Sequence, residues 1–251
     1  MNVMPSRPDP PVTRDLAVPR SVLAIGAHPD DIEFGCGATL AKWAAAGSEV
    51  HLLVLTDGAK GSWDPAADLV ALVARRRREQ RAAADVLGAT GVHHLDFIDG
   101  ELESGRAERA AVCEIIRRVR PMVVLGHDPW KRYRLHPDHL HAGRLTVDGI
   151  VAARDPHFHP GHGDPHRPAD LLLFEAEITD HVENAEGFLE TKTRALLCHE
   201  SQWQSTMGIE SRSTEVETQR SAFAARVRDD AGLAGGLAGL ALGEAFKLVP
   251  V

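Results

Sequence analysis

Short apolar runs of strand length alternate with longer helical stretches along most of this chain. The predicted strands lie at residues 22–27, 50–55, 92–97, 122–126 and 171–175, and most of them are apolar runs. The predicted helices lie at residues 37–46, 66–87 and 107–119, and a fourth ends near residue 153. This alternation is typical of an α/β fold, here a Rossmann-like three-layer sandwich with a mostly parallel sheet.

The first and fourth predicted strands, at 22–27 and 122–126, indicate where a site would form. In the common strand order 3-2-1-4-5 these two strands lie side by side, at the point where the order reverses. Sheets of this kind bind ligands beyond the carboxyl ends of the strands at that point. We therefore expect the active site at the carboxyl ends of strands 1 and 4.

A cluster of histidine and aspartate follows each of these two strands. His-Pro-Asp-Asp at residues 28–31 comes directly after the first strand, and His-Pro-Asp-His at residues 136–139 follows the fourth. Catalytic zinc is held by three nitrogen or oxygen ligands and keeps one position open. The candidate ligands are His28, Asp31 and His139. Ferrous iron accepts the same ligands, so the pattern predicts Zn²⁺ and leaves Fe²⁺ open.

The remaining members of the two clusters suit hydrolytic chemistry. Asp30 is not needed as a ligand and can serve as the general base for a water that the metal acidifies. His136 lies one helical turn before His139 and suits protonation of a leaving amine or stabilisation of an oxyanion. Asp138 is expected to orient one of the histidines. Together these groups indicate hydrolysis of an amide or an ester.

Ordinary structural explanations and a nucleotide site are the alternatives to this interpretation. Pro-Asp is common in turns and Asp often caps helices, so each cluster alone is a weak signal. Gly35 and Gly37 near the first turn suggest a dinucleotide site, but Leu40 stands where the third glycine belongs, and the acidic turn would repel a pyrophosphate. We exclude that interpretation.

The His-rich loop 155–168 is expected near the carboxyl edge of the sheet, where it would set the pocket size together with loop 60–68.

Length, charge and cysteine content narrow the class of protein. The 251 residues suit one α/β domain, and the net charge of −8 argues against nucleic acid as a partner. The three cysteines are widely spaced, which favours a reducing cytoplasm. The polar start of the chain and the short apolar stretch 231–242 argue against a signal peptide and a membrane span. We predict a cytoplasmic protein with a flexible Pro-rich tail at residues 1–19 and one domain at residues 20–251. The sequence leaves open whether the protein forms homo-oligomers.

The two clusters together resemble the LmbE-like (PIG-L) family of zinc-dependent N-acetylglucosaminyl deacetylases. Supporting similarities are Leu-Thr-Asp-Gly at 55–58, Arg76 with Glu79, Asp99 with Gly100, and Glu-Ala-Phe at 244–246. The resemblance implies a Rossmann-like LmbE-like domain over most of the chain, zinc on His28, Asp31 and His139, Asp30 as base and His136 as acid. It also implies that the substrate is bound by Arg76, Asp99, and Tyr133 or Arg134.

Three functions follow as hypotheses. The first is removal of an N-acetyl group from an N-acetylglucosaminyl-type amino-sugar substrate. The Ala- and Arg-rich composition suggests a high-GC bacterium. Because the family that the clusters resemble includes mycothiol enzymes in such bacteria, the resemblance implies the second hypothesis, a mycothiol S-conjugate amidase or another amide hydrolase for a larger acyl group. The third is a non-catalytic, metal-containing binding protein, which the presence of both Asp30 and His136 disfavours.

Overall fold

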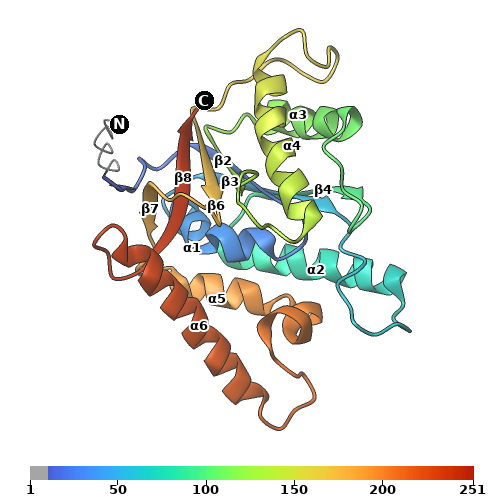
Figure 1. Cartoon of the computed structure of the whole chain (residues 1–251), viewed down its shortest axis with the longest axis vertical. Coiled ribbons are helices and arrows are strands. Elements are labelled where there is room, and N and C mark those ends of the chain that lie inside the picture. The colour runs from blue at the N-terminus through green and yellow to red at the C-terminus, as the bar shows by residue number, and fades with distance from the viewer. Residues whose placement is uncertain (1–10) are drawn as a thin grey trace, which may run out of the picture.

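This computed structural model describes residues 11–251 of the chain. These residues form one eight-stranded sheet with helices around it (Figure 1). Its order is β1-β7-β8-β6-β5-β2-β3-β4. Neighbouring strands are parallel except where β8 pairs with β6 and β7. The strands are β1 (Thr13–Arg14), β2 (Ser21–Gly26), β3 (Glu49–Thr56), β4 (Gly91–Phe97), β5 (Val123–His127), β6 (Asp170–Phe174), β7 (His181–Asn184) and β8 (Gly243–Pro250).

The predicted strand order is confirmed. The five predicted strands correspond to β2 to β6, and their order β4-β3-β2-β5-β6 is the 3-2-1-4-5 arrangement. β2 and β5 pair in parallel, from Val22 opposite Val123 to Ala24 opposite Leu125. Their carboxyl ends therefore meet at one edge of the sheet, where the two His/Asp clusters begin.

Helices cover both faces of the sheet. Successive residues of β2 point to opposite faces, and all of them are buried. Val22 and Ala24 pack against α1, α2 and α5, whereas Leu23 and Ile25 pack against α3 and α4 on the opposite face. A strand buried on both faces is apolar throughout, which explains the unbroken apolar runs in the sequence. The helices are α1 (Asp31–Ala45), α2 (Leu69–Leu87), α3 (Arg106–Val119), α4 (Pro137–Arg154), α5 (Leu189–Leu197) and α6 (Val216–Gly236), with a 3-10 turn (Glu200–Gln202) and a π-helical turn (Trp203–Met207) after α5.

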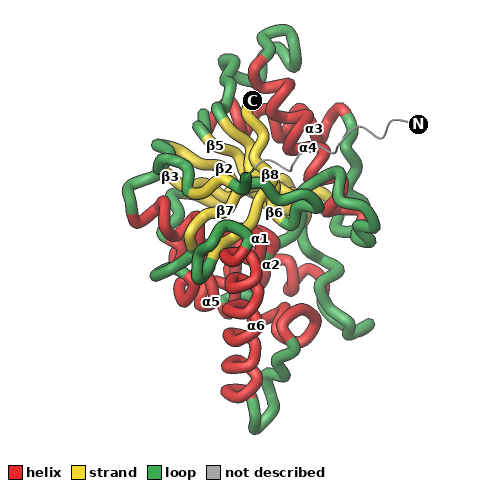
Figure 2. Tube along the Cα trace, turned by 60° about the vertical axis from the view of Figure 1, so that its left-hand side comes forward, coloured by secondary structure: helices red, strands yellow, loops and turns green. Residues whose placement is uncertain are grey.

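The sequence did not predict α5, α6 and β8. α6 buries only a narrow stripe of side chains. Its buried residues are spaced four apart and are Phe223, Val227, Ala231 and Gly235. Half of that stripe is Ala and Gly, so the apolar periodicity is weak. α6 lies next to α5 (Figure 2), and its end packs against the start of β8, where a Cβ on Gly235 would lie 2.9 Å from the backbone nitrogen of Gly243. The Ala/Gly-rich stretch 231–243 forms its end and the turn into β8.

Part of the predicted flexible tail belongs to the sheet. Residues 1–10 lie outside the described residues, but Thr13 and Arg14 form β1, which pairs with β7. Lys42 of α1 secures this segment, because its ammonium lies 2.8 Å from Asp15 and 2.6 Å from Glu183. The tail therefore does not extend to residue 19 as predicted.

The His-rich loop 155–168 lies at the amino edge of the sheet, so its prediction was wrong. α4 begins at the carboxyl edge, and its 18 residues carry the chain back by about 27 Å. His166 Nε2 lies 2.7 Å from the carbonyl oxygen of Pro121, just before β5. The guanidinium of Arg117 donates to several loop carbonyls, among them those of Asp155 and Phe158. The loop cannot set the size of a pocket at the opposite edge.

Helix α1 is broken by a kink that a carboxylate from β8 stabilises. Cys36 has non-helical backbone angles, with φ at −153°. The backbone N–H groups of Ala38 and Thr39, just after the kink, donate to Glu244 at 3.1 and 2.7 Å. Lys192 Nζ lies 2.6 Å from the same carboxylate. Glu244 therefore provides the acceptor that the kinked helix lacks.

We expect Glu244→Ala to lower the free energy of unfolding by about 3–5 kcal/mol. The change removes the carboxylate that pairs with the ammonium of Lys192, a residue that is only 9% exposed. It also leaves two backbone N–H groups of α1 without an acceptor. Urea denaturation followed by circular dichroism measures the effect. Glu244→Gln keeps an acceptor oxygen and is expected to lose less. A loss below 1 kcal/mol for Glu244→Ala would contradict this role.

Among residues 11–251, no helix combines the length and the apolar character that crossing a bilayer requires.

Candidate metal centre and active site

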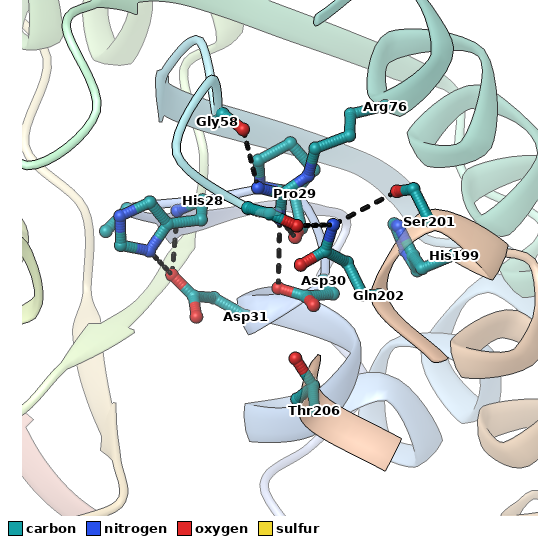
Figure 3. Close-up of polar contacts among 12 residues, drawn as sticks. His28, Pro29, Asp30, Asp31, Gly58, Arg76, His199, Ser201, Gln202 and Thr206 are labelled. Carbon is teal, nitrogen blue, oxygen red and sulfur yellow. Dashed lines mark hydrogen bonds and ion pairs between the residues drawn. The ribbon is translucent and has the colours of Figure 1, made fainter. Parts of the chain in front are cut away.

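The turn between β2 and α1 carries the first cluster to the carboxyl edge. All residues of β2 are buried, so the strand fixes the position of His28 just beyond its end. Asp30 has a φ of 100°, a conformation that is costly for a residue with a Cβ. The guanidinium of Arg76 donates to the carbonyl oxygens of Pro29 at 2.7 Å and Gly58 at 2.8 Å (Figure 3). Arg76 therefore holds the strained turn in place.

The sequence predicts that Arg76 binds substrate. Its side chain is part of the lining of the cleft described below, but only 3% of the residue is exposed. One of its terminal nitrogens donates to Pro29 in the turn, and the other donates to Gly58 in the loop after β3. The position fits a residue that shapes the site, and contact with substrate stays a prediction.

The three predicted ligands converge. One ligand atom each from His28, Asp31 and His139 lies within 4.8 Å of the others. Asp31 Oδ2 is 3.3 Å from His28 Nδ1, and Asp31 Oδ1 is 3.3 Å from His139 Nε2. Two tetrahedral ligands at zinc bond lengths lie about 3.3 Å apart. The donor set and its spacing therefore fit a zinc-sized cation.

Asp31 lies among three imidazoles. Its Oδ2 accepts the backbone N–H of His28 at 2.7 Å and lies 3.2 Å from His127 Nε2. Burial raises the pKa of Asp31, but His139 and His127 outweigh burial and hold that pKa well below its ordinary value. The carboxylate therefore stays ionised, as a metal ligand must.

Two further carboxylates lie behind the ring of His28, on the Nε2 side. This nitrogen is 3.1 Å from Asp138 Oδ2 and 3.2 Å from Asp99 Oδ1. Asp138 is itself held by the backbone N–H of Gly100 at 2.6 Å. A carboxylate behind a ligating histidine fixes its ring orientation and tautomer. Asp138, which was predicted to orient one of the histidines, therefore contacts His28. Asp99, which was predicted to bind substrate, contacts the same nitrogen of His28.

His127 and Glu175 belong to the same cluster, although neither was among the predicted site residues. His127 Nε2 contacts Asp31, its Nδ1 is 3.1 Å from Glu175 Oε2, and its ring stacks on His139 with centroids 4.4 Å apart. His127 ends β5 and Glu175 directly follows β6. The rule that singled out His28, a polar residue at the carboxyl end of a central strand, therefore applies to both.

Asp30 lies against a buried polar network. Its backbone N–H donates to Gln80 Oε1 at 3.3 Å, and Gln80 Nε2 donates to Glu33 at 2.6 Å. His199 Nε2 lies 3.5 Å from the other oxygen of Glu33. Burial raises the pKa of Asp30 to about 6, against the opposing charge of Arg76. A carboxyl group with this pKa suits proton transfer near neutral pH.

The residues around the second cluster take different positions. His136 lines the cleft, with its ring centroid 4.7 Å from that of His28 and 4.9 Å from that of His139. Arg134 lies behind the cleft, where Nη1 is 3.2 Å from His139 Nδ1. Tyr133 is 89% exposed. Neither Tyr133 nor Arg134 is brought into the cleft, although we predicted that one of them binds substrate.

The cluster opens into a cleft of about 530 Å³. Part of its lining comes from the loop after β3, within the segment 60–68 that was predicted to set the pocket size. Another part comes from the two short helical turns after α5, which were not predicted. Gln202 and Thr206 from these turns line the same cleft as Asp30 (Figure 3). The lining residues from these two segments are Lys60, Gly61, Trp63, Gln202, Ser205 and Thr206.

α4 packs closely against the chain after β5 at Gly143. A Cβ here would lie 2.7 Å from the carbonyl oxygen of His127 and 2.9 Å from the backbone nitrogen of Pro129. We expect Gly143→Ala to lower the free energy of unfolding by about 1–3 kcal/mol, because neither backbone can move freely. Urea denaturation measures it. Gly232→Ala is the control, since its nearest neighbour lies at 4.0 Å; equal stability of both variants would contradict the close packing.

A sequence model of one family, described as PIG-L: GlcNAc-PI de-N-acetylase, matches residues 23–150. The match covers more than half of the chain and includes both His/Asp clusters and the strands that carry them. The chain belongs to the PIG-L family. The resemblance inferred from the two clusters is therefore confirmed.

Two curated proteins that are similar to this chain are deacetylases. Diacetylchitobiose deacetylase of Thermococcus kodakarensis is 36% identical over 188 residues, which cover 73% of this chain and 70% of the relative. The 1D-myo-inositol 2-acetamido-2-deoxy-alpha-D-glucopyranoside deacetylase of Kineococcus radiotolerans is 34% identical over 166 residues. That second match covers 54% of this chain and 46% of the relative. The chain therefore spans less than half the length of the second relative.

Solved structures confirm the three-layer fold. N,N'-diacetylchitobiose deacetylase from Pyrococcus horikoshii is similar with a TM-score of 0.81 and 27% identity, covering 92% of this chain and 84% of that one. GalB, a 4-carboxy-2-hydroxymuconate hydratase from Pseudomonas putida KT2440, has a TM-score of 0.73 at 22% identity and covers 92% of this chain and 96% of its own. The likeness to GalB shows the shared fold alone.

Proposed function

We propose that this protein hydrolyses the acetamide of an N-acetylglucosaminyl compound, with Zn²⁺ held by His28, Asp31 and His139. The observation that carries the proposal is the 3.3 Å spacing of Asp31 from both histidines, which suits a tetrahedral zinc site. The membership in the PIG-L family and the deacetylase relatives support the acetamide as the bond that is cut. Fe²⁺ accepts the same donors and is the alternative metal.

The metal, when bound, supplies a Lewis acid for the acyl oxygen and lowers the pKa of water in the site. Asp30 accepts a proton from the attacking water at its carboxylate, which lines the cleft outside the ligand set. His136, also in the lining, donates a proton to the departing nitrogen. Asp138 and Asp99 keep the ring of His28 in one orientation through its Nε2.

The test is release of primary amine from N-acetylglucosamine and N,N'-diacetylchitobiose. The protein is stripped of metal and then restored with one equivalent of Zn²⁺ or Fe²⁺. We expect no release without metal and release with at least one of the two metals, with the faster one identifying the better cofactor. No release with metal demonstrably bound would contradict the proposal.

A further inference from the structure

The peptide unit between Pro29 and Asp30, which leads into the proposed base, is held at both of its polar atoms. Its carbonyl oxygen, that of Pro29, accepts from the guanidinium of Arg76 at 2.7 Å. Its N–H, that of Asp30, donates to Gln80 Oε1 at 3.3 Å. Asp30 has a φ of 100°, and such a conformation persists only where surrounding contacts hold it. The two contacts together fix the plane of this peptide, and with it the direction of the Asp30 side chain.

Both contacts come from one side of α2. Arg76 and Gln80 are four residues apart on this helix, so their side chains leave it on the same face. Only 3% of Arg76 and none of Gln80 is exposed. A buried polar group without a partner costs about 1–3 kcal/mol. Both ends of the Gln80 amide therefore need partners inside the protein.

Glu33 and His199 complete the surroundings of the Gln80 amide. Gln80 Nε2 donates to Glu33 Oε1 at 2.6 Å, and Glu33 Oε2 lies 3.5 Å from His199 Nε2. Neither Glu33 nor His199 is exposed. Burial lowers the pKa of His199, but the carboxylate of Glu33 outweighs burial and raises that pKa above its ordinary value. A carboxylate only accepts hydrogen bonds, so it draws Nε2 of Gln80 toward itself and leaves Oε1 for the N–H of Asp30.

We propose that Gln80 is a positioning residue for the catalytic base: its contact with the N–H of Asp30 keeps the carboxylate of Asp30 directed into the cleft. Glu33 and His199 keep the amide of Gln80 in the orientation that this contact needs. The inference rests on the proposed function, because it takes Asp30 as the group that accepts the proton. Gln80 is fully buried and does not line the cleft, so it acts on the reaction through Asp30.

Gln80→Met tests this role, because methionine has a similar length and no acceptor oxygen. We expect kcat to fall at least about tenfold, since a small displacement of a reacting group is costly, whereas KM and the metal content stay close to those of wild type. The metal-loaded protein is assayed for amine release from N,N'-diacetylchitobiose and N-acetylglucosamine, and kcat is expressed per bound metal. A merely structural role would lower the folded fraction and leave kcat per bound metal unchanged.

Two further variants serve as the control and the rescue. Gln219→Met is the matched control, since Gln219 Oε1 also accepts a backbone N–H, that of Glu210 at 2.8 Å, but Gln219 does not line the cleft. We expect its kcat to equal that of wild type. Gln80→Glu keeps an acceptor oxygen at the same chain length and is expected to regain at least about threefold of the activity lost in Gln80→Met.

The outcomes separate this inference from the proposed function. A fall in kcat per bound metal of less than tenfold in Gln80→Met would overturn the inference and leave the deacetylase function standing. Loss of metal together with activity would also overturn it, because Gln80 would then support the ligands. If Gln80→Met does not fold, Glu33→Gln decides: it removes the charge that orients the amide, and an unchanged kcat per bound metal would overturn the inference. If metal-loaded wild type releases no amine, the proposed function fails and this inference fails with it.

Discussion

Replacing Asp30 by asparagine is expected to lower kcat by about 10²- to 10⁴-fold and to leave the metal bound. The amide keeps the size of the carboxyl group but cannot accept a proton at neutral pH. Asp30 lies outside the group of ligand atoms formed by His28, Asp31 and His139, so the metal should not depend on it. Steady-state amine release gives kcat, and metal analysis of the same preparation gives the occupancy.

The control for this variant is Asp229→Asn, the same change at an exposed position of α6. We expect its kcat to equal that of wild type. Asp30→Asn with activity within tenfold of wild type would show that another group takes the proton. Loss of metal from Asp30→Asn would instead show that Asp30 helps to hold it.

Asp31→Ala is expected to lose metal and activity together. Asp31 lies between His28 and His139 with one oxygen toward each, and His127 contacts it as well. Without this carboxylate, the three imidazoles lose the oxygens that lie between them. The remaining carboxylates contact His28 at Nε2 and His127 at Nδ1, the nitrogens that do not contact Asp31. We expect metal affinity to fall by more than about 100-fold, which is the upper end for removing a supporting contact. A competitive chelator titration measures the affinity.

Asp138→Asn is the matched comparison for Asp31→Ala. Asp138 contacts His28 from the Nε2 side and lies outside the ligand group. We expect a loss of metal affinity of about 10- to 100-fold, because the ring of His28 loses its charged partner. An equal loss in both variants, or full metal content in Asp31→Ala, would contradict the assignment of Asp31 as a ligand.

The sequence by itself determined the central part of the fold and the core of the site. Most of the strands from β2 to β6 are buried on both faces, so they appear as apolar runs that need no tertiary knowledge to recognise, whereas the edge strand β4 carries His93, His94 and Asp96. Their order follows a common topology, and that topology brings together the clusters at 28–31 and 136–139. The convergence of His28, Asp31 and His139 was predictable because each follows from a strand end and a short motif.

Only the tertiary structure decided which other groups surround that core. Glu175 contacts His127, and Arg76 holds the turn at Pro29, across long stretches of sequence. These contacts depend on how separate elements pack, and no local periodicity encodes them. The same holds for the loop 155–168, whose position depends on the direction and length of α4. The packing of α6 beside β8 is also decided only by the tertiary structure, because a stripe of small residues does not reveal it in the sequence.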